Sequence, residues 1–252
     1  MIVLQQVSNP NITSFNLSLD MLIHLNREEN VSEGGLMELG NIQKELLEKR
    51  KIESFGDMQD MGFTKSFLSC NDILLGPKPS WDNMNTDQGY EVTSKIIETC
   101  SQSGDLYVQT YKNESKRDLV YNGTMMYTEI KMNIDTDSDF CFPVNCSFFE
   151  SVYQPDGALS RAMIRIPSAI FRLISEDITD KKSSVGTIFN MENGMMPNCL
   201  DDDDIDCSDL QKDSFLIQTT LDFEIVGTKV ENLTSENEIE IMFKLEENQV
   251  IY

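Results

Sequence analysis

The stretch "NDILLGPKPSWDNMNTDQGYEVTSKIIETC", residues 71–100, holds the only Trp of the chain, Trp81, between two apolar patterns of helical spacing. The first helix is expected to stop at "GPKP", because Gly76 can adopt the left-handed conformation and prolines cannot continue a helix. Asn85 or Thr86 can cap the next helix. We therefore predict that Trp81 packs this connection against the helices rather than lining a ligand pocket.

Helical spacing extends over about the first hundred residues, as in Leu36, Leu39, Ile42 and Leu46. From about Leu106 the period changes to two. Apolar and polar residues alternate in three segments, at 126–135, 217–226 and 238–245. Two shorter strands are expected at 162–166 and 185–191.

Strands with one polar face are typical of an antiparallel sheet, and several in series favour a sandwich. We therefore predict an α+β chain in two packed parts. Residues 1–105 would form an all-α helical subdomain, and residues 106–252 would form an antiparallel β-sandwich.

The charge excludes one class of partner. The chain has 43 acidic and 20 basic residues, a formal net charge of −23, so nucleic-acid binding is not expected.

No apolar run approaches the roughly 18 residues that a membrane-spanning helix needs. The start, "MIVLQQVSNPN", lacks the basic region of a signal peptide, so a secreted form would be cut from a longer precursor.

Two features favour an extracellular location. N-x-[ST] sequons, which accept N-linked glycans, occur at Asn11, Asn16, Asn30, Asn113, Asn122, Asn145 and Asn232. The six cysteines lack the paired spacing of zinc sites and fit disulfides better. Among the possible pairings we favour Cys141–Cys146 and Cys199–Cys207 as local loops and Cys70–Cys100 as a link between two helices. An Asn-rich cytosolic protein with accidental sequons is the alternative.

Signals for catalysis are absent from the sequence. His24, the only histidine, lies in a predicted helix, and no nucleophile-elbow, zinc-protease or phosphate-loop motif occurs. We expect no enzyme and no cofactor, and a hydrolase that uses His24 is the remaining catalytic alternative. The densest acidic cluster is expected to be a solvated hairpin tip or a calcium site, although it lacks EF-hand spacing; it comprises Asp201, Asp202, Asp203 and Asp204.

The stretch 71–100 resembles the helical part of the GAIN domain of adhesion G protein-coupled receptors, most of all the latrophilin-like ones. In that family a helix ends in an apolar pair, a Pro-containing turn follows, and a Ser-Trp-x-x-Met segment leads into a helix. The matching residues are Leu74, Leu75, Pro77 or Pro79, Ser80, Trp81, Met84, Asn85 and Gln88. Segments 127–144, 162–197 and 216–248 are similar to later family strands in pattern and order.

The resemblance implies an extracellular receptor module at the plasma membrane. Its sandwich would hold a C-terminal tethered-agonist strand and control signalling by the seven-helix membrane part, and an extracellular protein would be its ligand. The residues expected to line the groove for that strand, which also suit a plain sandwich core, are Ile217, Leu221, Phe223, Ile241, Phe243 and Leu245.

The chain departs from the family at its end. The Cys/Trp-rich GPS motif, which ends in His-Leu-Ser/Thr and cleaves itself, does not occur before Tyr252. We therefore expect no self-proteolysis by this chain and assign no nucleophile or base. Two alternatives remain open: the GAIN domain of a polycystin-like surface protein, and a secreted calcium-dependent adhesion or binding protein.

Overall fold

The computed structural model describes residues 19–25, 27, 31–52, 57–112, 117–143, 146, 162–174, 182–190, 219–226 and 239–243. These residues form a mixed α+β fold with two antiparallel sheets. The helices are α3 (Glu33–Ile52), α4 (Asp57–Leu74), α5 (Pro79–Asn83), α6 (Thr86–Tyr111) and α8 (Ser168–Ile174). The strands are β1 (Leu119–Asn122), β2 (Met126–Lys131), β3 (Phe140–Phe142), β4 (Ala162–Ile166), β5 (Ser184–Asn190), β6 (Thr219–Ile225) and β7 (Glu240–Phe243).

The connection around Trp81 is held as the sequence predicts. Helix α4 ends at Leu74, and Trp81 is 2 % exposed, with its Nε1 donating a hydrogen bond to the Leu74 carbonyl at 3.3 Å. Asn85 caps α6 by accepting a hydrogen bond from the Gln88 N–H at 2.9 Å, and the Gln88 side chain accepts one in return from the Asn85 N–H. The short helix α5, which carries Trp81, was not expected.

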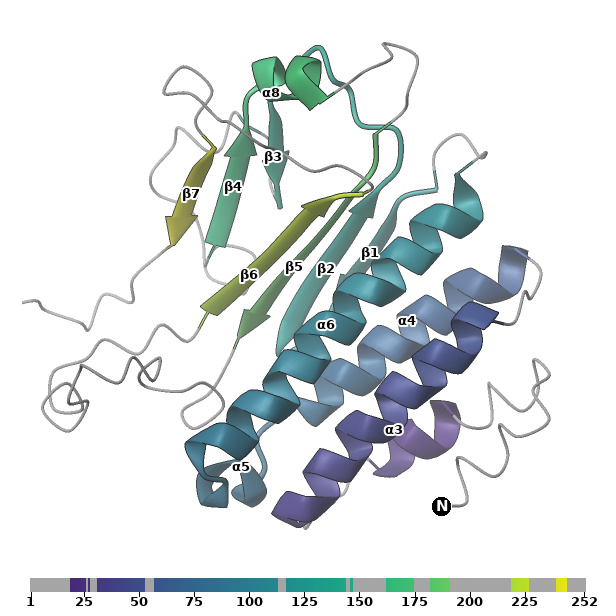
Figure 1. Cartoon of the computed structure of the whole chain (residues 1–252), viewed down its shortest axis with the longest axis vertical. Coiled ribbons are helices and arrows are strands. Elements are labelled where there is room, and N and C mark those ends of the chain that lie inside the picture. The colour runs from purple at the N-terminus through teal and green to yellow at the C-terminus, as the bar shows by residue number, and fades with distance from the viewer. Residues whose placement is uncertain are drawn as a thin grey trace, which may run out of the picture.

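The two sheets differ in size. The larger sheet has the strand order β1-β2-β5-β6, and the smaller sheet has the order β3-β4-β7, with every pairing antiparallel. Figure 1 shows α3, α4 and α6 along one side of the larger sheet. The strand expected at 162–166 corresponds to β4, whereas β1, β3 and α8 were missed because each is short.

Our prediction of one polar face is wrong for β2. Residues 126–130 are all buried, because both faces of the strand are covered. Met126 and Ile130 pack in the core shared with the helices, and Tyr127 packs in a second core shared with the smaller sheet. Thr128 is accommodated in the first core because its hydroxyl is 3.1 Å from that of Thr187 on the paired strand β5.

The expected boundary at residue 105 lies inside α6, which continues to Tyr111. The strand period predicted from Leu106 is therefore wrong for residues 106–111. Tyr107 and Tyr111 are buried in the core that the helices share with the larger sheet, with ring centroids 4.6 Å apart. The helical part has no separate core of its own, since its buried face is completed by the sheet.

One carboxylate joins α4 to the turn between β1 and β2. Asp72 accepts hydrogen bonds from the backbone N–H groups of Thr124 (3.1 Å), Met125 (2.7 Å) and Met126 (2.9 Å). A Cβ on Gly123 would lie 2.3 Å from this carboxylate, so only glycine permits the approach. Charge-assisted bonds to three backbone donors are among the stronger polar contacts in proteins.

No helix in the described ranges is both long enough and apolar enough to cross a membrane.

The burial of Trp81 leads to a stability prediction. Trp81→Ala should lower the free energy of unfolding by about 3–5 kcal/mol, because it leaves a cavity in the helical core and removes the hydrogen bond to Leu74. Urea denaturation followed by circular dichroism measures this. Tyr90→Ala is the matched control, since that ring is 49 % exposed on α6, and it should change the value by less than about 1 kcal/mol. Equal losses in both variants would contradict the anchoring role.

Candidate strand-binding seam

Strands β6 and β7 are the outer strands of the two sheets on neighbouring edges. Each pairs with a single described strand, β6 with β5 and β7 with β4. Figure 1 shows β6 and β7 on the same side of the molecule, with β4 between them. We call the outer edges of β6 and β7, with the side chains of Leu221, Phe223 and Ile241, the seam. An outer strand presents unpaired backbone N–H and C=O groups, which are suited to pairing with a further strand.

The apolar face of β6 borders the seam. Leu221 and Phe223 are only partly buried and pack against the core between the two sheets, in which Ile225 is buried. The ring of Phe223 lies 5.8 Å from both Phe140 and Phe142 of β3, centroid to centroid. Aromatic rings at this separation attract one another beyond the effect of area alone. Phe223 is thus held by two rings of β3 and remains partly exposed.

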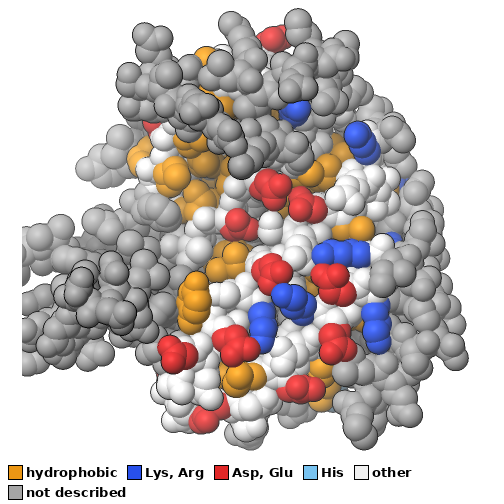
Figure 2. All heavy atoms as spheres, viewed as in Figure 1, with side chains coloured by type: hydrophobic (Ala, Val, Ile, Leu, Met, Phe, Trp, Pro, Cys, Tyr) orange, Lys and Arg blue, Asp and Glu red, His pale blue; other side chains and the backbone are white. Residues whose placement is uncertain are grey.

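Ile241 of β7 is the most exposed large apolar residue of the seam. Its partner in the register is Ile164 of β4, which is buried in the core between the sheets, so the two side chains share the inner face. Nevertheless Ile241 is 55 % exposed. Figure 2 shows apolar side chains gathered over β7, β4 and the adjacent end of β6. This face is suited to cover by another apolar side chain.

The structure describes only part of the groove predicted from the sequence. Leu221 and Phe223 lie on β6 and Ile241 lies on β7, at the seam. Phe243 lies on β7, where its backbone is paired in the register with Ala162 of β4. Ile217 and Leu245 fall outside the described residues.

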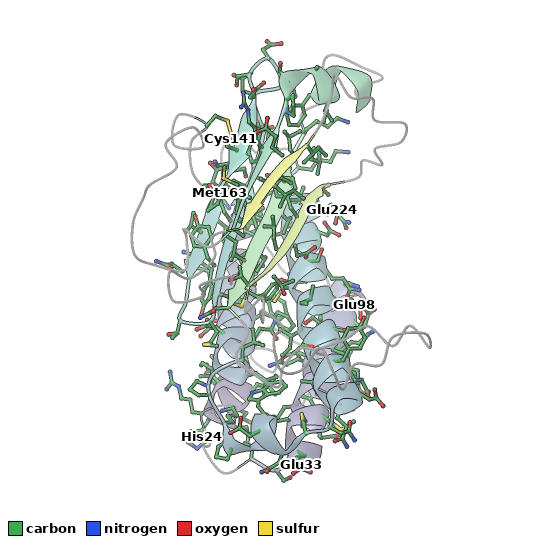
Figure 3. The ribbon with its side chains drawn as sticks, turned by 90° about the vertical axis from the view of Figure 1, so that its left-hand side faces the viewer. His24, Glu33, Glu98, Cys141, Met163 and Glu224 are labelled. Carbon is green, nitrogen blue, oxygen red and sulfur yellow. A yellow bond between two sulfur atoms is a disulfide. The ribbon has the colours of Figure 1, made fainter. Side chains whose placement is uncertain are left out.

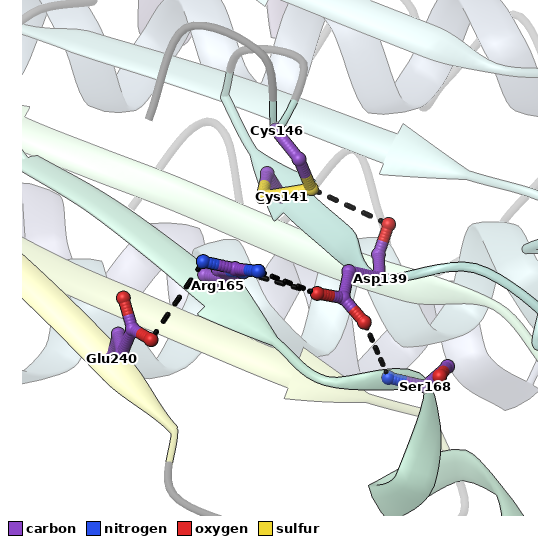
Figure 4. Close-up of a disulfide and its surroundings, with 6 residues drawn as sticks. All are labelled: Asp139, Cys141, Cys146, Arg165, Ser168 and Glu240. Carbon is purple, nitrogen blue, oxygen red and sulfur yellow. Dashed lines mark hydrogen bonds and ion pairs between the residues drawn. A yellow bond between two sulfur atoms is a disulfide. The ribbon is translucent and has the colours of Figure 1, made fainter. Parts of the chain in front are cut away.

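A polar network holds the outer face of the smaller sheet (Figure 4). The Asp139 carboxylate accepts hydrogen bonds from Arg165 Nε (3.1 Å) and Nη2 (2.8 Å) of β4, and from the Ser168 N–H (2.9 Å) that opens α8. The backbone bond from Ser168 and then the bonds from Arg165 lower the pKa of Asp139. Arg165 also lies 3.8 Å from Glu240, which connects the network to β7.

A second polar group is buried between the sheets. Glu129 is almost fully buried on β2, where it accepts a hydrogen bond from the Tyr127 hydroxyl at 3.4 Å and pairs with Lys131 at 3.1 Å. Burial and then the Glu129 charge raise the pKa of Tyr127 to about 12. Lys131 Nζ in turn lies 5.2 Å from the centroid of the Phe140 ring. The Tyr127 hydroxyl and Lys131 thus pair with the buried Glu129 carboxylate close to the Phe140 ring.

The cysteines support one predicted disulfide and contradict another. Cys141 and Cys146 are joined, next to the Asp139 network. Cys70 and Cys100 remain thiols, because their sulfurs point to different partners: Cys70 Sγ lies 3.9 Å from the Leu19 carbonyl, and Cys100 Sγ lies 3.1 Å from Asn71 Nδ2. Burial raises the pKa of Cys70 to about 12 and also raises the pKa of Cys100. Cys199 and Cys207 lie outside the described residues.

The remaining predicted sites lie elsewhere or are not described. His24 is exposed in the helical residues 19–25, and Figure 3 places it near Glu33, at the end of the molecule away from Cys141 and Met163. Asn122, at the end of β1, is exposed. The other candidates fall outside the described residues, namely Asn11, Asn16, Asn30, Asn113, Asn145, Asn232, Asp201, Asp202, Asp203 and Asp204.

Sequence reasoning missed Asp139 and Arg165. Both belong to segments that were recognised, but a charge on the outer face of a strand has many ordinary explanations. The available signal was the single Arg inside the apolar strand "AMIRI", which needs a carboxylate nearby. Within the described residues no group of three or more acidic, His or Cys side chains is arranged to hold a metal ion.

Comparison with known proteins adds no family. No protein-family model matches the chain, and no curated protein matches it either.

The Asp139 network predicts a pH dependence. A lowered pKa contributes stability above the unfolded value, near 3.9, and this contribution is lost as the pH falls through the folded value. Asp139→Asn should therefore cost about 1 kcal/mol at pH 7, a modest figure because the pair is partly exposed, and the cost should be smaller at pH 3, below the unfolded value. Urea denaturation at the two pH values measures it. Asp137→Asn, an exposed change in the same loop, is the control, and a cost independent of pH would contradict the prediction.

Proposed function

We propose that this chain is an extracellular GAIN-type domain of an adhesion-receptor-like protein, and that its seam holds a C-terminal strand that controls a membrane part. The observation that carries the proposal is the exposed inner face of the seam. Ile241 and the partly buried Phe223 belong to outer strands of two sheets, and each of these strands pairs with a single strand within the described part of the chain.

Two further features support the proposal. The residues around Trp81, which carry the family resemblance, form the helix end, anchor and capping box that such a segment requires. The two antiparallel sheets share a buried core that includes Phe142, Ile164 and Ile188, and a core between sheets is compatible with the β-sandwich that the resemblance implies.

The mechanism would be mechanical rather than catalytic. A strand added to β6 or β7 would gain main-chain hydrogen bonds from the outer edge, and its apolar side chains would cover Phe223 and Ile241. Because those contacts are lost together when the strand leaves, force or an extracellular ligand would release it in one step. The Asp139–Arg165–Glu240 network would keep β7 in place while the strand is pulled.

Retention of a second peptide is the decisive test. The protein should be purified under native conditions from a host that expresses its whole precursor, then denatured and examined by mass spectrometry. We expect a second peptide that begins at Ser or Thr and co-purifies without a covalent bond. Ile241→Arg should speed its loss at least about tenfold, because a charge would be buried beneath the strand, a cost of about 1.4 kcal/mol or more.

Val120→Arg is the matched control for this test. Val120 is an apolar residue that is 48 % exposed on β1, the opposite outer strand of the larger sheet. It should not change retention. Absence of a second peptide from the wild-type protein, or equal loss from both variants, would contradict the proposal. A rise in melting temperature in millimolar calcium, without a second peptide, would favour the calcium-dependent binding protein instead.

An extracellular location also predicts a glycan at Asn122. The side chain is exposed beside the turn that Asp72 holds, so the transferase and the glycan both have room. In a secreting eukaryotic cell, the peptide that contains Asn122 should carry an N-glycan that peptide N-glycosidase removes, and Asn122→Gln should abolish it. The peptide that contains Asn133, which is not in a sequon, is the control. An unmodified Asn122 in the secreted protein would contradict the prediction.

A further inference from the structure

Gly104 brings α6 close to the larger sheet. A Cβ at this position would lie 2.5 Å from Cγ1 of Val185 on β5, so the separation between helix and strand requires glycine. Asp105 follows Gly104 on α6, and α6 also lies against β6, the neighbour of β5. The close approach of the backbones therefore determines which side chains of α6 and β6 face each other.

The register of β6 presents two acidic residues to α6. Glu224 pairs with Val185, and Asp222 pairs with Thr187. Val185 packs in the core shared with the helices, so Asp222 and Glu224 lie on the helix-facing side of β6. The alternate residues, Leu221 and Phe223, face the core between the sheets. Strand β6 thus has one acidic face against α6 and one apolar face at the seam.

Asp105 on α6 and the helix-facing Asp222 and Glu224 on β6 therefore lie where the two elements contact each other, and we call these three residues the acidic cluster. Figure 2 shows acidic side chains gathered over β6 and the adjacent part of α6, and Figure 3 labels Glu224. Oδ1 of Asp105 is buried and receives no hydrogen bond within the described part of the chain. A buried acceptor without a donor is costly when its group is ionised.

Within the described residues, the neighbouring groups offset the charge of this cluster only in part. Lys51, at the end of α3, contributes a positive charge, but its Nζ donates to Glu48 at 2.8 Å and to Gln102 at 3.0 Å. Cys100, the titratable neighbour on α6, is a buried thiol whose pKa is raised by burial and then by Asp222 and Asp72. The residues that face the cluster from β5, Val185 and Thr187, carry no charge.

We propose that the acidic cluster is a proton-sensitive contact, which holds β6 tightly against α6 in mildly acidic solution and loosens it at neutral pH. Protonation removes the like-charge repulsion and lowers the cost of burying the unpaired Asp105 oxygen, because the group becomes neutral. Because β6 also borders the seam, the proton affects the strand whose other face is open to a ligand. The inference concerns only the contact between α6 and β6, so it can fail or succeed separately from the proposed function.

The electrostatics agree with the geometry. Burial, then Glu224 and Asp222, raise the pKa of Asp105 to about 6, and burial and Glu224 raise that of Asp222. A carboxyl with a raised folded pKa contributes its stability below the unfolded value, near 3.9. That contribution is lost as the pH rises through about 6. The contact between α6 and β6 should therefore weaken between about pH 4 and pH 7.

Direct titration of Asp105 tests the proposal. The chemical shift of its side-chain carbon should be followed by NMR in the full chain from pH 3 to pH 8, with Asp105→Asn used for assignment. We expect a midpoint above pH 5, and Glu224→Gln should lower it measurably, since one neighbouring charge is removed. Glu38→Gln, an exposed change on α3, is the control and should leave the midpoint unchanged.

Melting temperatures supply a second measurement. Asp105→Asn should melt about 2–4 °C above the wild type at pH 7.5, and this difference should vanish at pH 4.5, where the wild-type carboxyl is already neutral. A midpoint below pH 5, or a midpoint that does not respond to Glu224→Gln, overturns the proposal. If a variant fails to fold, the wild-type midpoint alone decides: above pH 5 it supports the proposal, and below pH 5 it overturns it.

Discussion

The Asp72 carboxylate fixes how the helices lie on the sheet. A tight turn with three backbone donors turned towards the core needs an acceptor there, because unpaired buried N–H groups are costly. Asp72 is that acceptor, and it comes from α4 rather than from the sheet. Gly123 leaves room for it. The Asp72 side chain therefore ties the helical layer to the turn between β1 and β2. The other strands of the larger sheet, β5 and β6, pair outwards from β2.

The position of the helices gives each strand of the larger sheet two different environments. One face packs against α4 and α6, and the other packs partly against the smaller sheet. In β2 both faces are buried, whereas in β6 the apolar face opens to the seam and the acidic face meets α6. The proposed function and the proton-sensitive contact thus use opposite faces of one strand, so a change on one face can alter the other through the strand itself.

Local interactions explain which parts of the fold could be predicted. The end of α4, the cap at Asn85 and the helical spacing of α3 depend on residues within a few positions of one another, and the structure agrees with them. The alternation at 162–166 is equally local. In contrast, the end of α6 at Tyr111 depends on Tyr107 and Tyr111 packing against distant segments, which spacing alone does not reveal.

The sequence by itself therefore determined where α4 ends and α6 begins, that antiparallel strands follow the helices, and that Trp81 is an anchor. Only the tertiary structure decided which faces are covered, that Cys70 and Cys100 point to different partners, and which carboxylates meet one another. The physical reason is the sequence separation over which each kind of interaction acts. Capping, turn preference and side-chain periodicity act along the chain, whereas burial, hydrogen-bond satisfaction and charge repulsion act through space between residues that the fold brings together.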